Sequence, residues 1–173
     1  MTGDIETRAD CELLVRSFYS RALTDPVIGF LFTDVAKLDV EAHVPQIASF
    51  WETLLLGSGS YNGRPFPPHL ELNMQVRLTR GHFDRWLLLW GETIDELFVG
   101  ERAEFAKAHA TRVAAAFESR LRSLEGRFAA ADPATGDPAA DSADSADSAD
   151  SADSPEPGLV VIQRPAGGRV APR

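Results

Sequence analysis

The stretch TRGHFDRWLLLWGETIDEL, residues 79–97, decides the fold class of this chain. Its large apolar side chains return every three or four residues, which is the spacing of one buried helix face. Thr79 belongs to the residue types that cap helix N-termini, and Gly100 is a residue type that ends helices. The stretch therefore predicts a long amphipathic helix. Its core face consists of Phe83, Trp86, Leu87, Trp90, Ile94 and Leu97.

The next segment, residues 101–125, repeats this spacing with smaller side chains and predicts a second long helix. At roughly 1.5 Å per residue the helix is about 36 Å long, enough to cross a small domain. Gly126 is predicted to close it. Its buried face consists of Ala106, Ala110, Val113, Phe117, Leu121 and Leu124.

Helical spacing also governs the first third of the chain. A helix is predicted over residues 10–23, and Asp25-Pro26 then ends it and starts a short helical turn. Asp39 can cap a third helix that ends at Gly57, provided that Pro45 falls in its first turn or marks a kink. The short turn carries Ile28, Leu31 and Phe32, and the third helix carries Ile47, Phe50, Trp51, Leu54 and Leu55.

Residues 57–68, GSGSYNGRPFPP, are rich in turn-forming residues and are predicted to be a loop, with His69 and Leu70 directly after it. Short helical domains rarely contain a dozen loop residues without a functional reason. Period-two alternation of β-branched residues persists nowhere, so strands are not expected. The predicted fold class is all-α.

Composition limits the classes of partner. The 173 residues include 26 acidic and 17 basic side chains, a net charge of −9. A nucleic-acid surface needs clustered Lys and Arg, and an anionic membrane repels an acidic protein, so neither is expected as a partner. Cys11 is the only cysteine, which excludes an intrachain disulfide and a multi-cysteine metal site. With no long apolar run and no apolar core in residues 1–10, we expect a cytoplasmic monomer.

The charge is divided unevenly along the chain. Residues 1–130 carry a net −4 and residues 131–173 a net −5. The C-terminal part contains five copies of Ala-Asp-Ser over residues 140–154, which cannot bury enough apolar area to offset the cost of ordering. We expect a folded domain over residues 1–128 and an acidic, low-complexity, disordered tail over residues 129–173.

Common catalytic and metal motifs are missing from the sequence. It contains no HExxH, CxxC or Glu-x-x-His pair, no P-loop and no GxSxG elbow. Of the four histidines, His82 is expected to face solvent and His109 to serve the structure. His43 precedes a strongly apolar helix face, and His69 follows Pro67-Pro68.

His43 and His69 together suggest one flat apolar cofactor between their segments. Haem has these properties, because its iron takes a neutral imidazole on one side and leaves the other side open for a gas. A buried Tyr hydroxyl or Trp N–H needs a hydrogen-bond partner, and an iron-bound gas can be one.

Several motifs, in order, resemble the truncated haemoglobins, and in particular their third group. The resemblance covers roughly residues 5–125. Val40 departs from the pattern, since a Trp often stands at that place. The matching motifs are Phe18-Tyr19, Asp25-Pro26-Val27-Ile28-Gly29, Phe32, His43-Val44-Pro45-Gln46-Ile47, Phe50-Trp51-Glu52, Leu55-Leu56-Gly57, Tyr61-Asn62-Gly63, Pro65, His69 and His82-Phe83-Asp84-Arg85-Trp86-Leu87.

The resemblance implies a shortened globin, two helices packed over two, that binds haem b. It implies that His69 ligates the iron and that Tyr19 and Trp86 donate hydrogen bonds to the bound gas. It implies that His43, on the same side as the gas, acts as a gate.

The resemblance also implies roles for residues around the haem. Phe32, Phe50 and Trp51 would line or flank the pocket. Tyr61 and Arg64 would lie near a haem propionate.

The function implied is binding of dioxygen, nitric oxide or another diatomic gas. Turnover of nitric oxide or peroxide would need an external reductase, since no flavin or nicotinamide motif is present. Two alternatives stay open: a helical interaction module without a cofactor, and a gas-sensing module whose tail contacts a partner.

Overall fold

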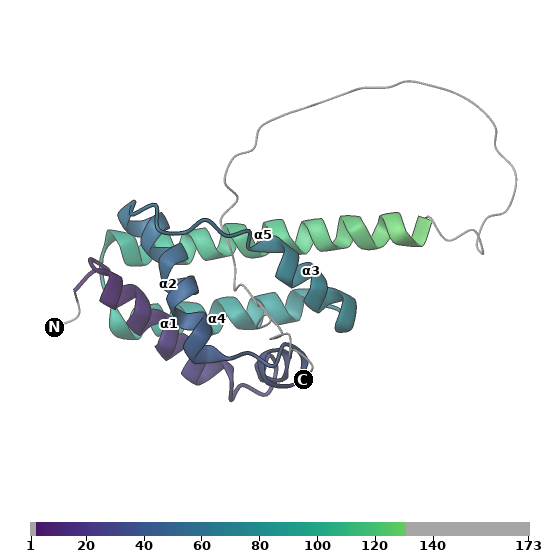
Figure 1. Ribbon diagram of the computed structural model, residues 1–173, viewed down its shortest axis with the longest axis horizontal. Helices are drawn as coiled ribbons and strands as arrows, with labels where there is room; N and C mark the ends of the chain where they lie inside the picture. Colours follow the sequence, from purple (N-terminus) through teal and green to yellow (C-terminus); the bar gives the residue numbers. More distant parts are fainter. Residues whose placement is uncertain (1–2, 131–173) are drawn as a thin grey trace, which may run out of the picture.

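The computed structural model describes residues 3–130, with side chains up to residue 127. Within this range the chain is helical and contains no strand, which confirms the predicted all-α class (Figure 1). The tail expected from its composition lies, from residue 131 on, outside the described residues. In chain order the elements are α1 (Arg8–Ala22), the short π-helical turn η1 (Leu31–Val35), α2 (Val40–Leu56), α3 (Phe66–Gln75), α4 (Arg80–Leu97) and α5 (Glu101–Ala130).

The helices form two packed pairs. α1 packs against α2, and α4 packs against α5, which runs beside it in Figure 1. The first pair lies over the second, because α1 also contacts α4 and α2 also contacts α5. The largest side chains of the shared core are almost fully buried: Trp90, Tyr19, Phe18, Phe117, Ile5 and Leu14.

Helix ends follow the sequence signals at several places. The Asp39 carboxylate accepts the Ala42 N–H at 3.2 Å and caps α2, and Gly57 ends it with a φ of +70°, a backbone conformation that favours glycine. Thr79 caps α4 as expected. Pro45 lies inside α2, just past the first turn, and its carbonyl accepts bonds from Arg8 at 2.7 Å and Ser49 at 2.9 Å.

Two predicted boundaries were wrong. The loop ends before residue 66, because Pro67 and Pro68 occupy the first turn of α3 and His69 lies within this helix. Proline suits a first turn, where a backbone N–H has no helical partner in any case. The last helix does not stop at Gly126 but continues to Ala130. A single glycine inside a helix costs only about 1 kcal/mol and does not end it by itself.

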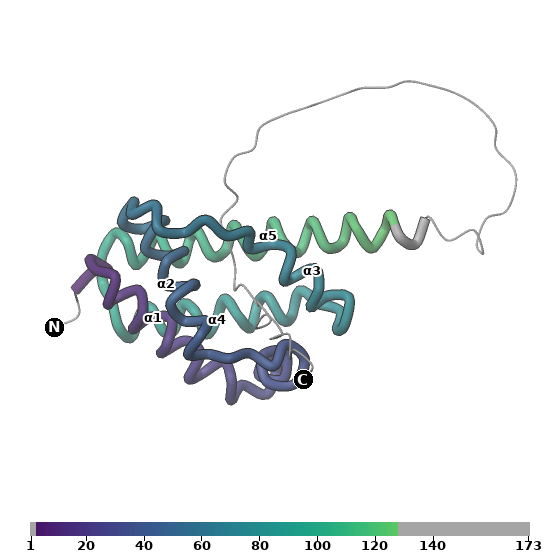
Figure 2. The backbone as a smooth tube through the Cα atoms, viewed as in Figure 1, coloured from purple at the N-terminus to yellow at the C-terminus, as the bar shows by residue number. Residues whose placement is uncertain are grey.

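The N-terminal segment is fixed to the start of α5. Asp4 accepts the backbone N–H groups of Arg102 and Ala103, both at 2.9 Å. These bonds satisfy donors that the first turn of a helix leaves free. The segment before α1 thus lies at the end of the molecule where α4 is connected to α5 (Figure 2).

Candidate functional site

Three buried polar side chains from three helices gather at one place in the core. Tyr19 comes from α1, His43 from α2 and Trp86 from α4, and each is at most 5% exposed. The ring centroids of Tyr19 and His43 are 6.1 Å apart. The Phe18 ring lies 5.4 Å from the Tyr19 ring and 5.6 Å from the Trp86 ring, so both residues have Phe18 as a common neighbour.

The polar atoms of these three residues are orphaned, meaning that none has a hydrogen-bond partner within residues 3–127. They are the Tyr19 hydroxyl, the His43 Nε2 and the Trp86 Nε1. A buried polar group without a partner costs about 1–3 kcal/mol, and native proteins contain few of them. Three such groups in one place indicate that a ligand completes the site.

Burial keeps the acid–base groups of this cluster neutral. It raises the pKa of the Tyr19 hydroxyl and lowers the pKa of His43 to about 4. At neutral pH the cluster therefore offers a neutral O–H, a neutral N–H and a neutral imidazole to a small molecule.

His69 is held in the form that can ligate a metal. Its Nδ1 lies 2.8 Å from the carbonyl oxygen of Pro65, four residues earlier, which is the N-cap residue of α3. A carbonyl only accepts, so Nδ1 carries the proton and Nε2 keeps its lone pair. The ring centroid of Phe117, on α5, lies 4.8 Å from the His69 ring.

The environment of His69 connects it with His43. Burial lowers the pKa of His69 to about 4, the Pro65 hydrogen bond opposes this shift, and the electrostatic influence of His43 adds to it. The pKa of His69 thus depends partly on His43, although the two imidazoles come from α3 and α2.

Of the other predicted pocket residues, two lie beside rings of the candidate site and two lie away from them. Phe32, in η1, lies 5.8 Å from the Tyr19 ring, and Phe50 lies 5.4 Å from Tyr61, whose hydroxyl is also orphaned. Trp51 is buried but packs toward α4 and α5. Arg64 is exposed, in the loop before α3.

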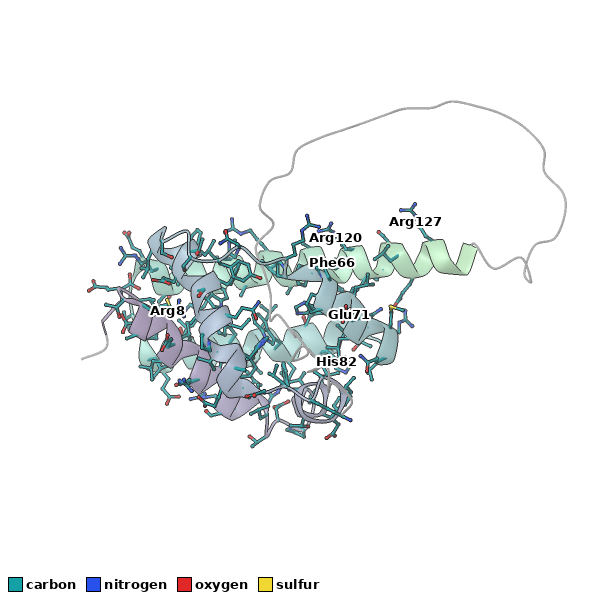
Figure 3. The ribbon with its side chains drawn as sticks, in the orientation of Figure 1. Arg8, Phe66, Glu71, His82, Arg120 and Arg127 are labelled. Atoms are coloured by element: carbon teal, nitrogen blue, oxygen red, sulfur yellow. The ribbon has the colours of Figure 1, made fainter. Side chains whose placement is uncertain are left out.

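The loop is attached to α2 by a polar cluster. The Glu52 carboxylate accepts bonds from Arg8 and from the Ser60 hydroxyl, both at 2.8 Å. The Tyr61 N–H donates to the Thr53 hydroxyl at 3.0 Å. At the far end of the loop, the Phe66 ring lies under the Arg120 guanidinium, 4.7 Å away, where Figure 3 shows α3 meeting α5.

One ion pair at the edge of the site had no sequence signal. The Asp25 carboxylate accepts two bonds from Arg85, at 2.6 and 2.8 Å, and also caps the turn by accepting the Val27 and Ile28 N–H groups. The Arg85 bond holds the pKa of Asp25 below its ordinary value. Because Arg85 adjoins Trp86, the pair ties the turn before η1 to the helix that carries Trp86. The sequence indicated the cap but not its partner 60 residues later.

The two remaining histidines lie outside the cluster: His82 was expected to face solvent but is half-buried and caps its own helix, and His109 was expected to serve the structure. His82 Nδ1 accepts the Thr79 N–H at 3.2 Å and completes the cap of α4, at the place labelled in Figure 3. His109 is buried on α5 against the Trp51 ring.

The described residues do not form a metal site whose ligands all come from protein side chains. Within the described residues, no group of three or more His, Cys, Asp and Glu side chains could hold a metal ion. Nor is any helix there long and apolar enough to cross a membrane. Haem iron needs only one protein ligand, because the porphyrin supplies four, and His69 meets that requirement.

Comparisons with known proteins agree with the fold. No family model matches the chain. A group 3 truncated haemoglobin from Campylobacter jejuni is 28% identical over 116 residues, which cover 65% of this chain and 89% of that protein. The crystal structure of a group III truncated haemoglobin from Campylobacter jejuni superposes with a TM-score of 0.63 at 27% identity, covering 70% of this chain and 95% of that one. The resemblance seen in the sequence is confirmed: this chain is related to the group III truncated haemoglobins and has the truncated-globin fold.

Proposed function

We propose that the chain binds haem b through His69 and binds a diatomic gas, such as dioxygen or nitric oxide, on the opposite face. The observation that carries this proposal is the pairing of one oriented imidazole with a cluster of orphaned polar atoms. The relation to truncated haemoglobins supports it. Haem supplies an iron centre that accepts an imidazole on one side and a gas on the other.

The residues of the site fit this group in type and in environment. His69 offers Nε2, and the Pro65 carbonyl fixes the orientation of the imidazole. Tyr19 and Trp86 donate hydrogen bonds from O–H and N–H to the bound gas. His43 is neutral at physiological pH and controls entry to the same side.

Around these groups, further side chains define the edges of the site. Phe32 and Phe50 supply apolar surface and exclude water, and Trp51 supports Phe50 from behind at 5.2 Å. The proposal assigns the propionates to Arg64, which is exposed in the loop before α3, and to the buried hydroxyl of Tyr61 in the same loop.

The proposed function is tested by titrating the purified full chain with haem. We expect saturation at about one haem per chain, as for a single-ligand globin site, with an intense Soret band in the ferric, ferrous and ferrous–carbon monoxide forms. Absorbance that rises without saturation, as with haem adsorbed to a protein surface, would contradict the proposal.

Removing the Tyr19 hydroxyl should speed gas release. Two hydrogen bonds of about 1 kcal/mol each slow dissociation roughly 30-fold, and one of them accounts for roughly fivefold. We therefore expect Tyr19→Phe to release dioxygen roughly fivefold faster in a stopped-flow measurement. The matched control is Thr93→Val, which removes another buried hydroxyl, one that donates to the Leu89 carbonyl at 2.7 Å, and should leave the rate unchanged. An unchanged rate in Tyr19→Phe removes Tyr19 from the mechanism.

Tight gas binding favours chemistry on the ligand over transport. Conversion of nitric oxide and dioxygen to nitrate consumes one electron, and reduction of a peroxide consumes two, so turnover requires an external reductase. Turnover of nitric oxide or peroxide uses the same site and requires no other part of the fold.

A further inference from the structure

All three tryptophans of the chain form one continuous stack through the core. Trp86 and Trp90 lie on successive turns of α4. Their ring centroids are 5.5 Å apart, and the angle between their planes is 10°. Trp51, from α2, stacks on Trp90 at 4.7 Å and 23°. Their four-residue spacing in α4 aligns the first two rings, and the packing of α2 adds the third.

The stack connects the candidate site with the surface. At one end, Trp86 belongs to the cluster that contains Tyr19. At the other end, the Trp51 ring meets His109 at 6.4 Å, and His109 stacks on Phe105 at 5.7 Å. Phe105 is 43% exposed. A series of neighbouring rings, with centroids 4.7–6.4 Å apart, thus leads from Trp86 to the exposed Phe105 on α5.

Packing alone does not explain this arrangement. The indole Nε1 of Trp90, in the middle of the stack, is orphaned and has no assigned ligand partner, a cost that a Phe or Leu at this place would avoid. An indole without a proton acceptor at Nε1 keeps its proton when it loses an electron. The neighbouring ring can then replace the lost electron by electron transfer alone, and no proton has to be returned to the indole.

We propose that Trp86, Trp90 and Trp51 form a relay that carries single electrons from a donor at the Phe105 surface to the candidate haem site. The relay rests on the proposed haem function and adds a route for the electrons that peroxide reduction consumes. Its oxidant is a hydroperoxide at the haem, and its reductant is a one-electron donor in solution.

The electrons balance over two passes of the relay. In each pass Trp86 gives one electron to the haem side, Trp90 restores Trp86, Trp51 restores Trp90, and the donor restores Trp51. Two electrons and two protons from water cleave the O–O bond of the hydroperoxide, giving an alcohol and water. Two oxidised donor molecules remain, and every indole ends in its starting state.

The test uses the full haem-loaded chain with hydrogen peroxide, first without a donor. We expect freeze-quench electron paramagnetic resonance to show a tryptophan radical, whose signal narrows when the tryptophans carry ring deuterium. Loaded wild-type protein that gives no tryptophan radical overturns the relay. A wild-type chain that binds no haem overturns the proposed function instead, so the two failures are distinguishable.

The second arm measures ferrocyanide oxidation by hydrogen peroxide in single-site variants. Trp90→Phe keeps an aromatic ring but interrupts the relay, and we expect at least a roughly tenfold slower rate, which corresponds to a barrier about 1.4 kcal/mol higher. Trp51→Phe, a second variant that leaves Trp86 and Trp90 in place, should behave likewise. Phe98→Leu, which truncates a buried aromatic ring outside the stack, should leave the rate unchanged.

Each variant is first loaded with haem and compared with wild type in its ferrous–carbon monoxide spectrum. Variants with a normal spectrum and an undiminished ferrocyanide rate overturn the proposal. A general structural effect would instead slow Phe98→Leu as much as Trp90→Phe, and that result overturns it as well.

Discussion

His69→Ala should lose the saturable haem spectrum, with haem affinity lowered by more than about 100-fold. Removing a residue that contacts a metal ligand lowers metal affinity about 10–100-fold. Removing the protein's only ligand should lower haem affinity further. The Pro65 carbonyl then loses its hydrogen-bond donor, but the start of α3 keeps its prolines. A haem titration followed at the Soret band measures the loss.

The matched controls are the histidines with structural roles. His109→Gln alters a buried imidazole on α5, and His82→Ala removes the cap of α4, so both should load haem with a normal spectrum. Free imidazole added to His69→Gly should restore the band, because it replaces the missing ligand. Haem binding that survives in His69→Ala with a wild-type spectrum would assign the iron to another residue.

The haem-free chain should lose stability as the pH falls from about 6.5 to 4. His43, His69 and His109 are buried, and burial lowers the pKa of each to about 4 from an ordinary value of 6.5. Between these values the unfolded chain binds more protons than the folded one, so protons favour unfolding. Each histidine contributes a slope that approaches about 1.4 kcal/mol per pH unit in this window.

Urea midpoints measured from pH 7.5 to pH 4 test this expectation. His109→Gln should lessen the slope by about one histidine's share, because it removes a single titrating group away from the site. Asp25 acts in a lower window: Arg85 holds its pKa below 3.8, so its stabilisation is present above that value and declines only below it. Stability that is flat between pH 6.5 and 4 would show that these imidazoles are not buried in the neutral form.

The regular parts of the fold were predictable from local spacing. The aromatic period of residues 79–97 predicts α4 (Arg80–Leu97) almost to the residue, and Asp39 marks the start of α2 correctly. Local signals failed where one residue type is found in two kinds of structure. Pro67 and Pro68 begin a helix here instead of ending a loop, and Gly126 is tolerated within α5.

The site could be predicted only through its residue types and order. Tyr19, His43, His69 and Trp86 were named from the sequence, but the orphaned atoms of Tyr19, His43 and Trp86 depend on the packing of α1, α2 and α4. The partnership of Asp25 with Arg85 joins residues far apart in the chain, and no local pattern encodes it. The stack of Trp51 on Trp90 likewise arises only where α2 lies across α4.

The attachment of Arg8 to Glu52 makes the N-terminus part of the site. Arg8 holds Glu52, and Glu52 holds Ser60, in the loop that leads to Pro65 and hence to the backbone carbonyl that orients His69. A truncation that removes Arg8 therefore loosens the loop that leads to His69, the proposed iron ligand.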